Sequence, residues 1–479
     1  MARVLLVNSN LMKPPIAPIA LDYLAGCLDA AGHQVALLDL CFEDDWNAAI
    51  RSRLARAPEP HVIALTLRNT DDCYCASRQT FLPQVAAIAR ALEAHAGDAR
   101  LVIGGVGFSL MPRAILRAMP KWLGVVGDGE LALRALAAAA DRGEPAPEVP
   151  GQVRVAPSGE FEARPAAHGE LPRIPTRRSF VDNARYFREG GQGGIETKRG
   201  CAGRCIYCAD PVAKGRNYRL RPPAEVADEM ENLLAQGVDC LHTCDSEFNL
   251  PPDHALAVCE EFARRRLGER LRWYAYCAPA PMTRELAAAM RRAGCVGINF
   301  GTDSGCEAML RRLRRDFTVA DIERALALCR EAGITCMCDL LLGGPGETRD
   351  TAEETIRLMR HIGPDAVGVA IGLRIYPGTE LARVVAAEGV GAANPNLVGD
   401  ACDNDDFARP VFYRSAELGA DYGEALQRRL REDPRFFVGG SGDETDYNYN
   451  ANEILANAVR AGARGAYWDI LRKARLGEP

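Results

Sequence analysis

The chain has 479 residues, of which 48% are hydrophobic and 25% charged, and this globular composition excludes a disordered chain, a collagen and a coiled-coil rod. Its formal net charge of −6 is not the basic excess that nucleic-acid binding needs, so no nucleic-acid partner is expected. No apolar run reaches the ~18 residues of a membrane span, and Asn8, Ser9 and Asn10 interrupt the first apolar run. We therefore expect no membrane contact, no secretion signal and a cytoplasmic location.

Residues 1–140 alternate short apolar runs with helical patterns. Near-continuous apolar strands separated by helices are typical of a parallel sheet that is buried on both faces. The sequence therefore predicts an α/β, doubly wound, Rossmann-like domain here. The expected strands are residues 3–7, 35–40, 61–67, 101–105 and 122–126, and a helix is expected over 83–95.

The carboxyl ends of these predicted strands carry polar or glycine-rich residues. Ligands of doubly wound sheets bind outside these ends, and glycine lets the backbone approach a bulky ligand closely. Four such tips on one edge predict a ligand site. Its candidate residues are Asn8, Ser9, Asn10, Thr66, Arg68, Asn69, Gly104, Gly105, Val106, Gly107, Gly127, Gly129 and Glu130.

The rest of the chain divides into three parts. Residues 141–185 are rich in Pro, Gly and charge and are predicted to be a surface linker. Residues 186–385 contain six βα units, which predicts a partial (β/α)6 TIM-type barrel with its chemistry at the carboxyl ends of the strands. Residues 386–479 are predicted to be a small, mostly α-helical C-terminal region, with helices over 452–460 and 466–473. The expected barrel strands are 195–198, 240–244, 273–276, 296–300, 335–342 and 366–370.

Three of the seventeen cysteines form a local cluster. Cys201, Cys205 and Cys208 follow the first barrel strand with the spacing C-x3-C-x2-C. Thiolates suit iron–sulfur clusters or zinc, but a structural zinc site closes with four ligands and no fourth Cys or His lies nearby in the sequence. Three ligands leave one corner of a [4Fe–4S] cluster open to a small molecule. The flanking Lys198, Arg199 and Arg204 are expected to favour ionised thiols, and structural zinc is the alternative.

The cysteine loop, with Tyr207 before its last cysteine, resembles that of the radical S-adenosylmethionine superfamily. The resemblance covers about 190–385, because further family-like segments follow in order at 243–247, 273–277, 299–305, 339–348 and 374–379. It implies that the three cysteines hold a [4Fe–4S] cluster. The implied S-adenosylmethionine site comprises Tyr207, Asp245, Glu247, Tyr274, Tyr276, Asn299, Asp303, Ser304, Asp339 and Arg374.

In architecture and position, residues 1–140 resemble the N-terminal domain of cobalamin-dependent radical S-adenosylmethionine enzymes. The resemblance implies that the strand tips named above bind cobalamin. The cobalt-ligating Asp-x-His-x-x-Gly motif is absent, and His33 and His61 lie at strand starts, on the opposite edge. We therefore expect that the lower cobalt ligand is not a histidine of the protein, and that Arg68, Asn69 and Asp71 lie near the corrin.

The resemblance also implies a reaction. In such enzymes the open iron binds S-adenosylmethionine, reductive cleavage gives a 5′-deoxyadenosyl radical that takes a hydrogen from the substrate, and cobalamin delivers a methyl group. We expect a C-methyltransferase that uses a [4Fe–4S] cluster, S-adenosylmethionine and cobalamin. Its substrate is expected to be a small molecule or a peptide, and its electron donor an external flavodoxin- or ferredoxin-type protein. The alternatives are a rearranging or oxidising cobalamin enzyme, a methylthiotransferase, and a non-enzymatic cobalamin and iron–sulfur sensor.

The C-terminal region contains several aromatic residues, Tyr447, Tyr449, Tyr467 and Trp468. We predict that they cap the barrel and select the substrate. The alternative is that they only pack the core of the appended region.

Overall fold

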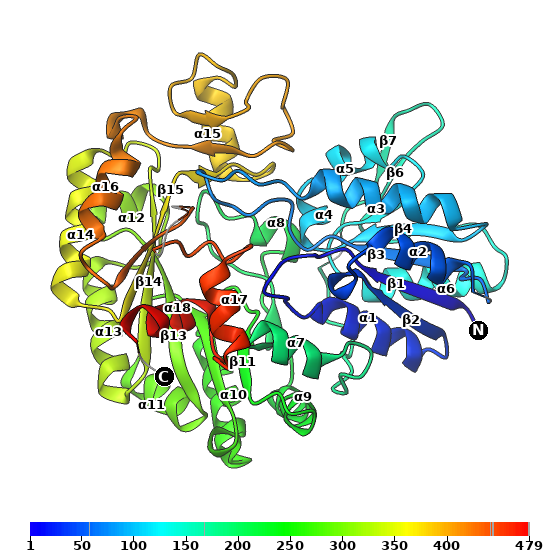
Figure 1. The fold of residues 1–479 in the computed structure, drawn as a ribbon, viewed down its shortest axis with the longest axis horizontal. Coiled ribbons are helices and arrows are strands. Elements are labelled where there is room, and N and C mark those ends of the chain that lie inside the picture. Colours follow the sequence, from blue (N-terminus) through cyan, green and yellow to red (C-terminus); the bar gives the residue numbers. More distant parts are fainter. Residues whose placement is uncertain (57, 167, 441, 443–444, 478–479) are drawn as a thin grey trace.

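The computed structural model describes residues 1–56, 58–166, 168–440, 442 and 445–477. Two units, each built on a twisted sheet, lie side by side, and the C-terminal helices return to lie across the second sheet (Figure 1). The α/β fold class predicted from the sequence is confirmed. Within the described residues, no helix combines the length and the apolar character that crossing a membrane requires.

The first unit is built on a sheet with the strand order β2-β1-β3-β4-β5-β6-β7, of which the first five are parallel. The order reverses between β1 and β3, and ligands of doubly wound sheets bind at such a switch point. The parallel strands are β1 (Arg3–Asn8), β2 (Gln34–Asp39), β3 (Val62–Thr66), β4 (Arg100–Gly104) and β5 (Leu123–Val125).

Helices cover both faces of this sheet, which explains the continuous apolar strands. Leu5 and Val7 pack against the face covered by α2 (Trp46–Leu54), α3 (Leu82–His95) and α5 (Pro112–Ala118). Val4 and Leu6 pack on the opposite face, against α1 (Ile19–Ala30) and α6 (Glu130–Asp141). The short helix α4 (Val106–Leu110) begins directly beyond β4, and a 3-10 turn over Leu40–Phe42 follows β2.

Part of the segment expected to be a linker is folded. β6 (Gln152–Val155) pairs antiparallel with β5, and β7 (Phe161–Ala163) continues the same sheet. The strands are short and their outward positions are exposed, so neither gives the apolar run that identified the buried strands. Helix α7 (Asn183–Gly190) then leads into the second unit.

The second unit is an open, all-parallel barrel with the strand order β19-β15-β14-β13-β12-β11-β8 over the described residues. Five of the six expected strands are present at their predicted places, whereas the first spans Gly193–Ile195 and not 195–198. The C-terminal region supplies the further strand β19 (Phe436–Val438), beside β15. The other strands are β8 (Gly193–Ile195), β11 (Cys240–Thr243), β12 (Arg272–Cys277), β13 (Cys295–Asp303), β14 (Thr335–Leu342) and β15 (Ala366–Ile371).

The outer face of this barrel is covered by helices, and its apolar core lies between them and the strands. A small ribbon formed by β9 (Lys198–Arg199) and β10 (Arg219–Leu220) flanks the cysteine loop. The helices are α8 (Asp210–Lys214), α9 (Pro223–Ala235), α10 (Pro252–Arg264), α11 (Arg284–Arg292), α12 (Glu307–Arg312), α13 (Val319–Ala332), α14 (Arg349–Ile362) and α16 (Tyr422–Leu430), with a 3-10 turn at Leu267–Glu269.

The C-terminal region is not as helical as predicted. Besides β19 and helix α15 (Glu380–Glu388), it forms a sheet of β16 (Leu373–Arg374), β18 (Val411–Tyr413) and β17 (Leu397–Gly399), followed by a 3-10 turn at Ala416–Leu418. The two expected helices are present as α17 (Glu453–Arg460) and α18 (Tyr467–Leu476). They lie across the inner face of the barrel strands (Figure 1), where Trp468 packs against Tyr274 of β12.

Candidate functional site

The three thiols of the cysteine loop face a common space between β9 and α8. A Cβ added to Gly203 would lie 3.2 Å from the Cys201 sulfur and 3.8 Å from the Cys205 sulfur. Burial, then Asp210 and the other two thiols, raise the pKa of Cys208 well above its usual value. Three soft thiolates around one space are a donor set that fits an iron–sulfur cluster.

A buried arginine that the sequence analysis did not single out lies against these thiols. Arg315 donates to the Cys205 sulfur at 2.9 Å and to the Tyr207 hydroxyl at 3.2 Å. Its guanidinium also lies 3.3 Å from Asp303 and 3.7 Å from Glu247. Arg315 stands in a run of arginines, 311, 312, 314 and 315, and nothing in the sequence distinguishes it from its exposed neighbours.

Three candidate residues, Tyr207, Asp303 and Glu247, therefore gather with Arg315 beside the cysteine loop. Tyr207 donates to Asp303 at 2.5 Å, and one buried oxygen of Glu247 has no hydrogen-bond partner among the described residues. Burial raises the pKa of Glu247 to about 7, although Arg315 opposes that shift. A guanidinium with two carboxylates next to the thiols is a donor and acceptor set that fits the amino and carboxylate groups of S-adenosylmethionine.

Asp245, expected at the same site, instead holds the backbone that leads into the cysteine loop. It accepts from the Thr197 amide at 2.8 Å and from the Lys198 ammonium at 3.1 Å. Arg199 is likewise paired, with Glu196, Asp128 and Glu130. Lys198 and Arg199 were expected to favour ionised thiols, but they are neutralised by these carboxylates, and the cation that contacts a thiol is Arg315.

The inner surface of the barrel brings together three further candidates. Tyr276, Asn299 and Asp339 stand on the neighbouring strands β12, β13 and β14, where Asn299 donates to Asp339 at 2.7 Å. His242 of β11 packs against Tyr276 with ring centroids 4.7 Å apart. Tyr276 and Asn299 are register partners, and Asp339 lies two residues beyond Met337, the partner of Asn299, toward the carboxyl end of β14. We call His242, Tyr276, Asn299 and Asp339 the polar layer.

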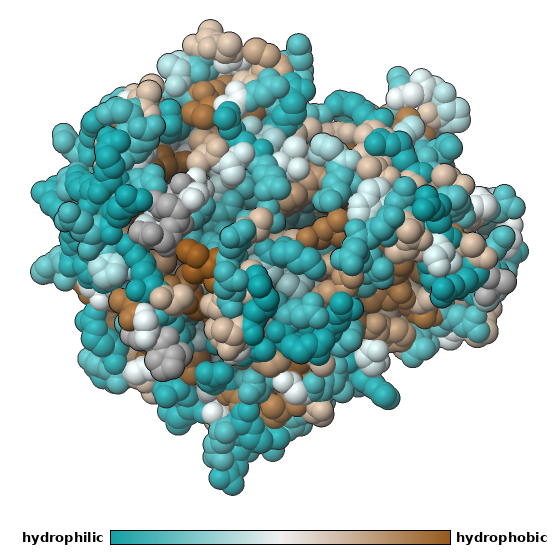
Figure 2. Space-filling model, viewed as in Figure 1, coloured by the Kyte–Doolittle hydropathy of each residue, from teal (hydrophilic) through white to brown (hydrophobic). Residues whose placement is uncertain are grey.

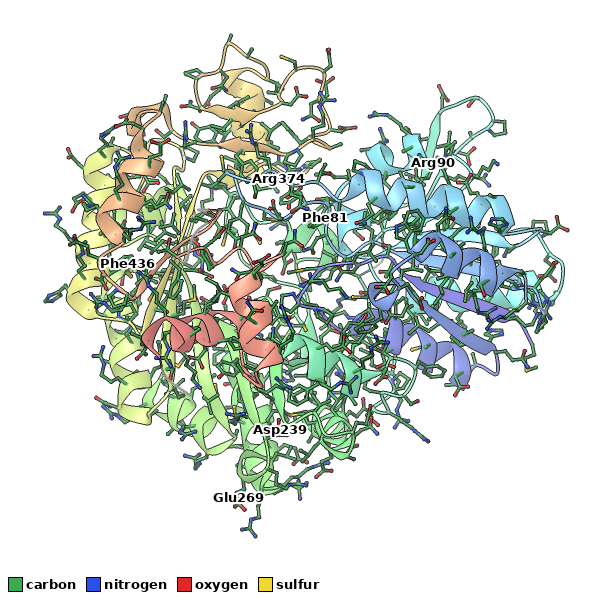
Figure 3. All side chains as sticks on the ribbon, viewed as in Figure 1. Phe81, Arg90, Asp239, Glu269, Arg374 and Phe436 are labelled. Atoms are coloured by element: carbon green, nitrogen blue, oxygen red, sulfur yellow. The ribbon has the colours of Figure 1, made fainter. Side chains whose placement is uncertain are left out.

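Three candidates lie elsewhere. Tyr274 is buried beneath α18 and donates to Asp469 at 2.8 Å, and Ser304 is buried against Thr355. Arg374 lies between the two units (Figure 3), where it pairs with Asp71 at 2.9 Å and donates to backbone carbonyls, including that of Phe407. Its guanidinium is thereby occupied, so Arg374 connects the units instead of contributing to the S-adenosylmethionine site as expected.

At the carboxyl edge of the first sheet, several candidate residues are already bonded to other residues of the protein. Asn8 donates to Asp39 and to Tyr186, and the Ser9 hydroxyl donates to the Thr66 carbonyl at 2.6 Å. Glu130 is buried and pairs with Arg199 at 2.7 Å. These residues shape the edge and join it to the second unit.

Other groups at this edge remain available to a ligand. The Asn10 side-chain nitrogen is buried without a partner among the described residues, and Val106 at the start of α4 is 41% exposed. Arg68 is exposed, and its guanidinium lies 3.9 Å from the Met12 sulfur. A free amide donor, an exposed guanidinium and an exposed apolar side chain at one strand edge fit a large ligand with both apolar and amide surfaces, as cobalamin has.

Two of the glycines at this edge, Gly105 and Gly107, are required by close backbone packing. Gly105 has φ +106°, and a Cβ there would lie 2.4 Å from the Leu67 carbonyl oxygen. A Cβ on Gly107 would lie 3.0 Å from the backbone of Asn69. At Gly127, with φ +84°, the near neighbour is the His168 ring, whereas Gly104 and Gly129 have looser surroundings. His33 and His61 bind backbone amides at the opposite edge, as their positions in the sequence indicated.

The carboxyl edges of the two sheets face each other. Burial raises the pKa values of Cys244 and Tyr276 to about 11 and about 12, and Arg68 from the first unit acts in the opposite direction on both. Both side chains keep water-accessible surface between the two edges, and we call the space between these edges the chamber. The visible face of the molecule is largely hydrophilic, with apolar residues in scattered patches (Figure 2).

The C-terminal aromatic residues divide between the two predicted roles. Tyr467 and Trp468 are buried in the core between α17, α18 and the barrel, as the packing alternative predicted. Tyr447 belongs to the same core and Tyr449 packs against it, but both also lie near Asp339 of the polar layer. Tyr74, which no sequence signal marked, comes from the loop after β3 and packs edge-on against Tyr447.

Comparisons with known proteins agree with this arrangement. The B12 binding domain model matches residues 10–137, and the radical SAM superfamily model matches residues 195–359. The chain is 34% identical to a tryptophan 2-C-methyltransferase of Streptomyces laurentii, over 97% of this chain and 95% of that one. The structure of the radical S-adenosylmethionine methyltransferase TsrM from Kitasatospora setae, with tryptophan substrate and a S-adenosylmethionine analogue bound, is 32% identical, covers 99% of each chain and superposes with a TM-score of 0.90.

A more distant structure shares the fold. The cobalamin-dependent enzyme OxsB is 16% identical, has a TM-score of 0.70, and covers all of this chain and 80% of its own. The cofactors that the sequence implied, a [4Fe–4S] cluster, S-adenosylmethionine and cobalamin, are those of the TsrM structures. The chain therefore belongs to the cobalamin-dependent radical S-adenosylmethionine methyltransferases.

Proposed function

We propose that this protein transfers a methyl group from S-adenosylmethionine, by way of cobalamin, to a ring carbon of tryptophan or a closely related indole. The observation that supports this substrate is the 34% identity, over almost the whole chain, to a tryptophan 2-C-methyltransferase. The aromatic lining of the chamber, from Tyr74, Tyr276, Tyr447 and Tyr449, suits an aromatic substrate.

In this proposal each edge of the chamber has a separate task. Cys201, Cys205 and Cys208 hold the cluster, while Arg315, Asp303 and Glu247 orient S-adenosylmethionine beside it. The strand tips from Asn10 to Gly107 hold cobalamin on the facing edge. When bound, the cluster supplies electrons and cobalamin carries the methyl group. An external flavodoxin- or ferredoxin-type protein is the proposed reductant.

The test is an anaerobic assay with reconstituted protein. The enzyme, loaded with iron, sulfide and cobalamin, is incubated with S-adenosylmethionine labelled in its methyl group, a reductant and tryptophan. The proposal predicts labelled methyltryptophan, with the methyl on a ring carbon by NMR, and S-adenosylhomocysteine as coproduct. Unlabelled product would indicate rearrangement or oxidation, a methylthio group would indicate sulfur insertion, and no product would overturn the proposal. The same samples show whether 5′-deoxyadenosine forms, as the radical route requires.

A further inference from the structure

The polar layer inside the barrel contains an acid without a basic partner. Asp339 has no basic side chain within ion-pair distance among the described residues, and one of its oxygens accepts no hydrogen bond there. Its other oxygen accepts from Asn299, which is 1% exposed and whose own side-chain oxygen is also without a partner. Buried acceptors that lack donors are costly, so this pair is suited to a ligand that brings donors.

The fold makes room for this carboxylate. A Cβ on Gly368 of β15 would lie 2.3 Å from the free Asp339 oxygen and 3.0 Å from the Tyr447 ring. A Cβ on Gly439, after β19, would lie 2.2 Å from the Tyr74 ring and 3.0 Å from the Tyr447 ring. Gly368 on β15 and Gly439 directly after β19 therefore leave space for the carboxylate and the two rings.

Tyrosines surround the acid on its open side. Tyr447 lies 5.6 Å from Tyr74 and 6.0 Å from Tyr449, centroid to centroid, and Tyr449 lies 5.3 Å from Tyr467. After burial, the largest influence on the pKa of Tyr276 is Asp339, and the largest on Tyr449 is Tyr276. Tyr276 and Tyr449 therefore both lie near Asp339, and Tyr276 keeps 37% of its surface exposed.

Two loops from opposite ends of the chain close this end of the chamber. We call residues 72–79 and 445–450 the paired loops. Tyr74 donates to the Tyr447 carbonyl at 3.1 Å, Asn448 to Asp72 at 3.0 Å, and Asn450 to Gln79 at 2.6 Å. These three hydrogen bonds join the two loops beside Tyr447, which lies next to Asp339.

Resting on the proposed function, we propose that Asp339 binds the ammonium group of a free aromatic amino acid, whose ring lies between Tyr276 and Tyr449. The ammonium supplies both the positive charge and the donors that Asp339 and Asn299 lack, and it also lies near the faces of the tyrosine rings, which attract cations. Aromatic rings on either side favour a flat, apolar substrate ring. The substrate class is therefore an unmodified aromatic amino acid.

The charges that face Asp339 are consistent with this role. Burial raises the pKa of Asp339 to about 6, Asn299 and Tyr447 lower it, and Asp303 raises it. The tyrosines near Asp339 are held neutral by burial, which raises the pKa of each: Tyr74, Tyr276, Tyr447 and Tyr449. Asp339 is therefore largely ionised at pH 7, and a bound ammonium favours the ionised form further.

The test compares two substrates in the loaded holoenzyme. Tryptophan carries the ammonium group, and indole-3-propionate lacks it but keeps the ring and carboxylate. We expect the wild type to prefer tryptophan, and Asp339→Asn to lower kcat/KM for tryptophan on the order of tenfold or more while leaving indole-3-propionate unchanged. Asp365→Asn, an exposed acid at the other end of β14, is the matched control, and iron and cobalamin content show that each variant is loaded.

Each outcome separates this inference from the proposed function. Methylation of neither compound by the wild type overturns the proposed function, and the inference with it. Equal use of both compounds by the wild type, or an equal loss with both in Asp339→Asn, overturns the inference alone. If Asp339→Asn does not fold, the inference is tested by calorimetry on the wild-type holoenzyme, which compares the affinities for tryptophan and for N-acetyltryptophan. Equal affinities would contradict recognition of the ammonium group.

Discussion

The two units meet along two very different surfaces. On the side away from the chamber, Arg178 is 1% exposed and contacts Asp22 of α1 at 2.6 Å and Glu229 of α9 at 2.9 Å. Arg221 approaches the same Glu229 at 2.7 Å.

Buried pairs between the units also flank the chamber, Arg374 with Asp71 and Arg199 with Glu130. The paired loops, in contrast, are joined by hydrogen bonds among tyrosine, amide and carboxylate groups, several of which remain partly exposed.

This difference indicates that the buried ion pairs and the paired loops have separate roles. Buried charges that satisfy one another fix the relative position of the two sheets, because removing any one of them leaves another unpaired in the interior. Partly exposed hydrogen bonds contribute far less each, so the paired loops can open locally without disturbing the units. We infer that the buried ion pairs set the distance between the two strand edges and that the paired loops admit the substrate.

Removing the buried arginine between the units is expected to have the largest effect on stability. Arg178→Met leaves Asp22 without its cation and should lower the free energy of unfolding by about 3–5 kcal/mol in denaturant titrations. The control is Arg383→Met, which removes an exposed pair with Glu380 and should change stability by about 1 kcal/mol or less. Equal effects of the two variants would show that the buried network does not hold the units together.

Substrate binding in the chamber should depend on pH because Asp339 titrates. Its pKa is raised to about 6, so its negative charge is lost as the pH falls from 7 to 5 while the substrate ammonium stays charged. KM for tryptophan should therefore rise about tenfold over this interval. KM measured in Asp339→Asn should be insensitive to the same change. A wild-type profile that matches that of the variant would remove Asp339 from substrate recognition.

The smallest effect is expected in the paired loops. Asn448→Ala removes the hydrogen bond to Asp72 and should cost about 1 kcal/mol of stability. Amide hydrogen exchange should nevertheless accelerate selectively in 72–79 and 445–450. Asn396→Ala, which removes a hydrogen bond to Glu388 elsewhere on the surface, is the control and should leave exchange in these segments unchanged. Exchange that accelerates across both units would contradict independent opening of the loops.

The features that could be predicted from the sequence are those that depend on a local residue pattern. Apolar runs identified the buried parallel strands, since both faces of each sheet are covered, and the C-x3-C-x2-C spacing identified the cysteine loop because all its ligands lie in eight residues. Asp303, Glu247 and Tyr207 were identified by family-like segments, and they gather beside the thiols as expected.

What the sequence did not predict depends on contacts between distant segments. Arg315 is 110 residues from the Cys205 that it contacts, and Tyr74 is 373 residues from Tyr447. Strand β19 has only three residues, too few to show a period, and owes its place to pairing with β15. Arg374 was assigned to the S-adenosylmethionine site from its segment alone, whereas its partner Asp71 lies in the other unit.

The central claim is that the cysteine loop and the edge of the first sheet hold two separate cofactors on facing sides of one chamber. The direct measurement is the iron and cobalamin content of anaerobically reconstituted protein, for the wild type and for a variant with Cys201, Cys205 and Cys208 all changed to Ala. The account predicts a [4Fe–4S] cluster and one cobalamin per wild-type chain, and loss of the iron but retention of cobalamin in the variant. Iron that persists in the variant, or a wild-type chain that binds zinc and no cobalamin, would contradict it.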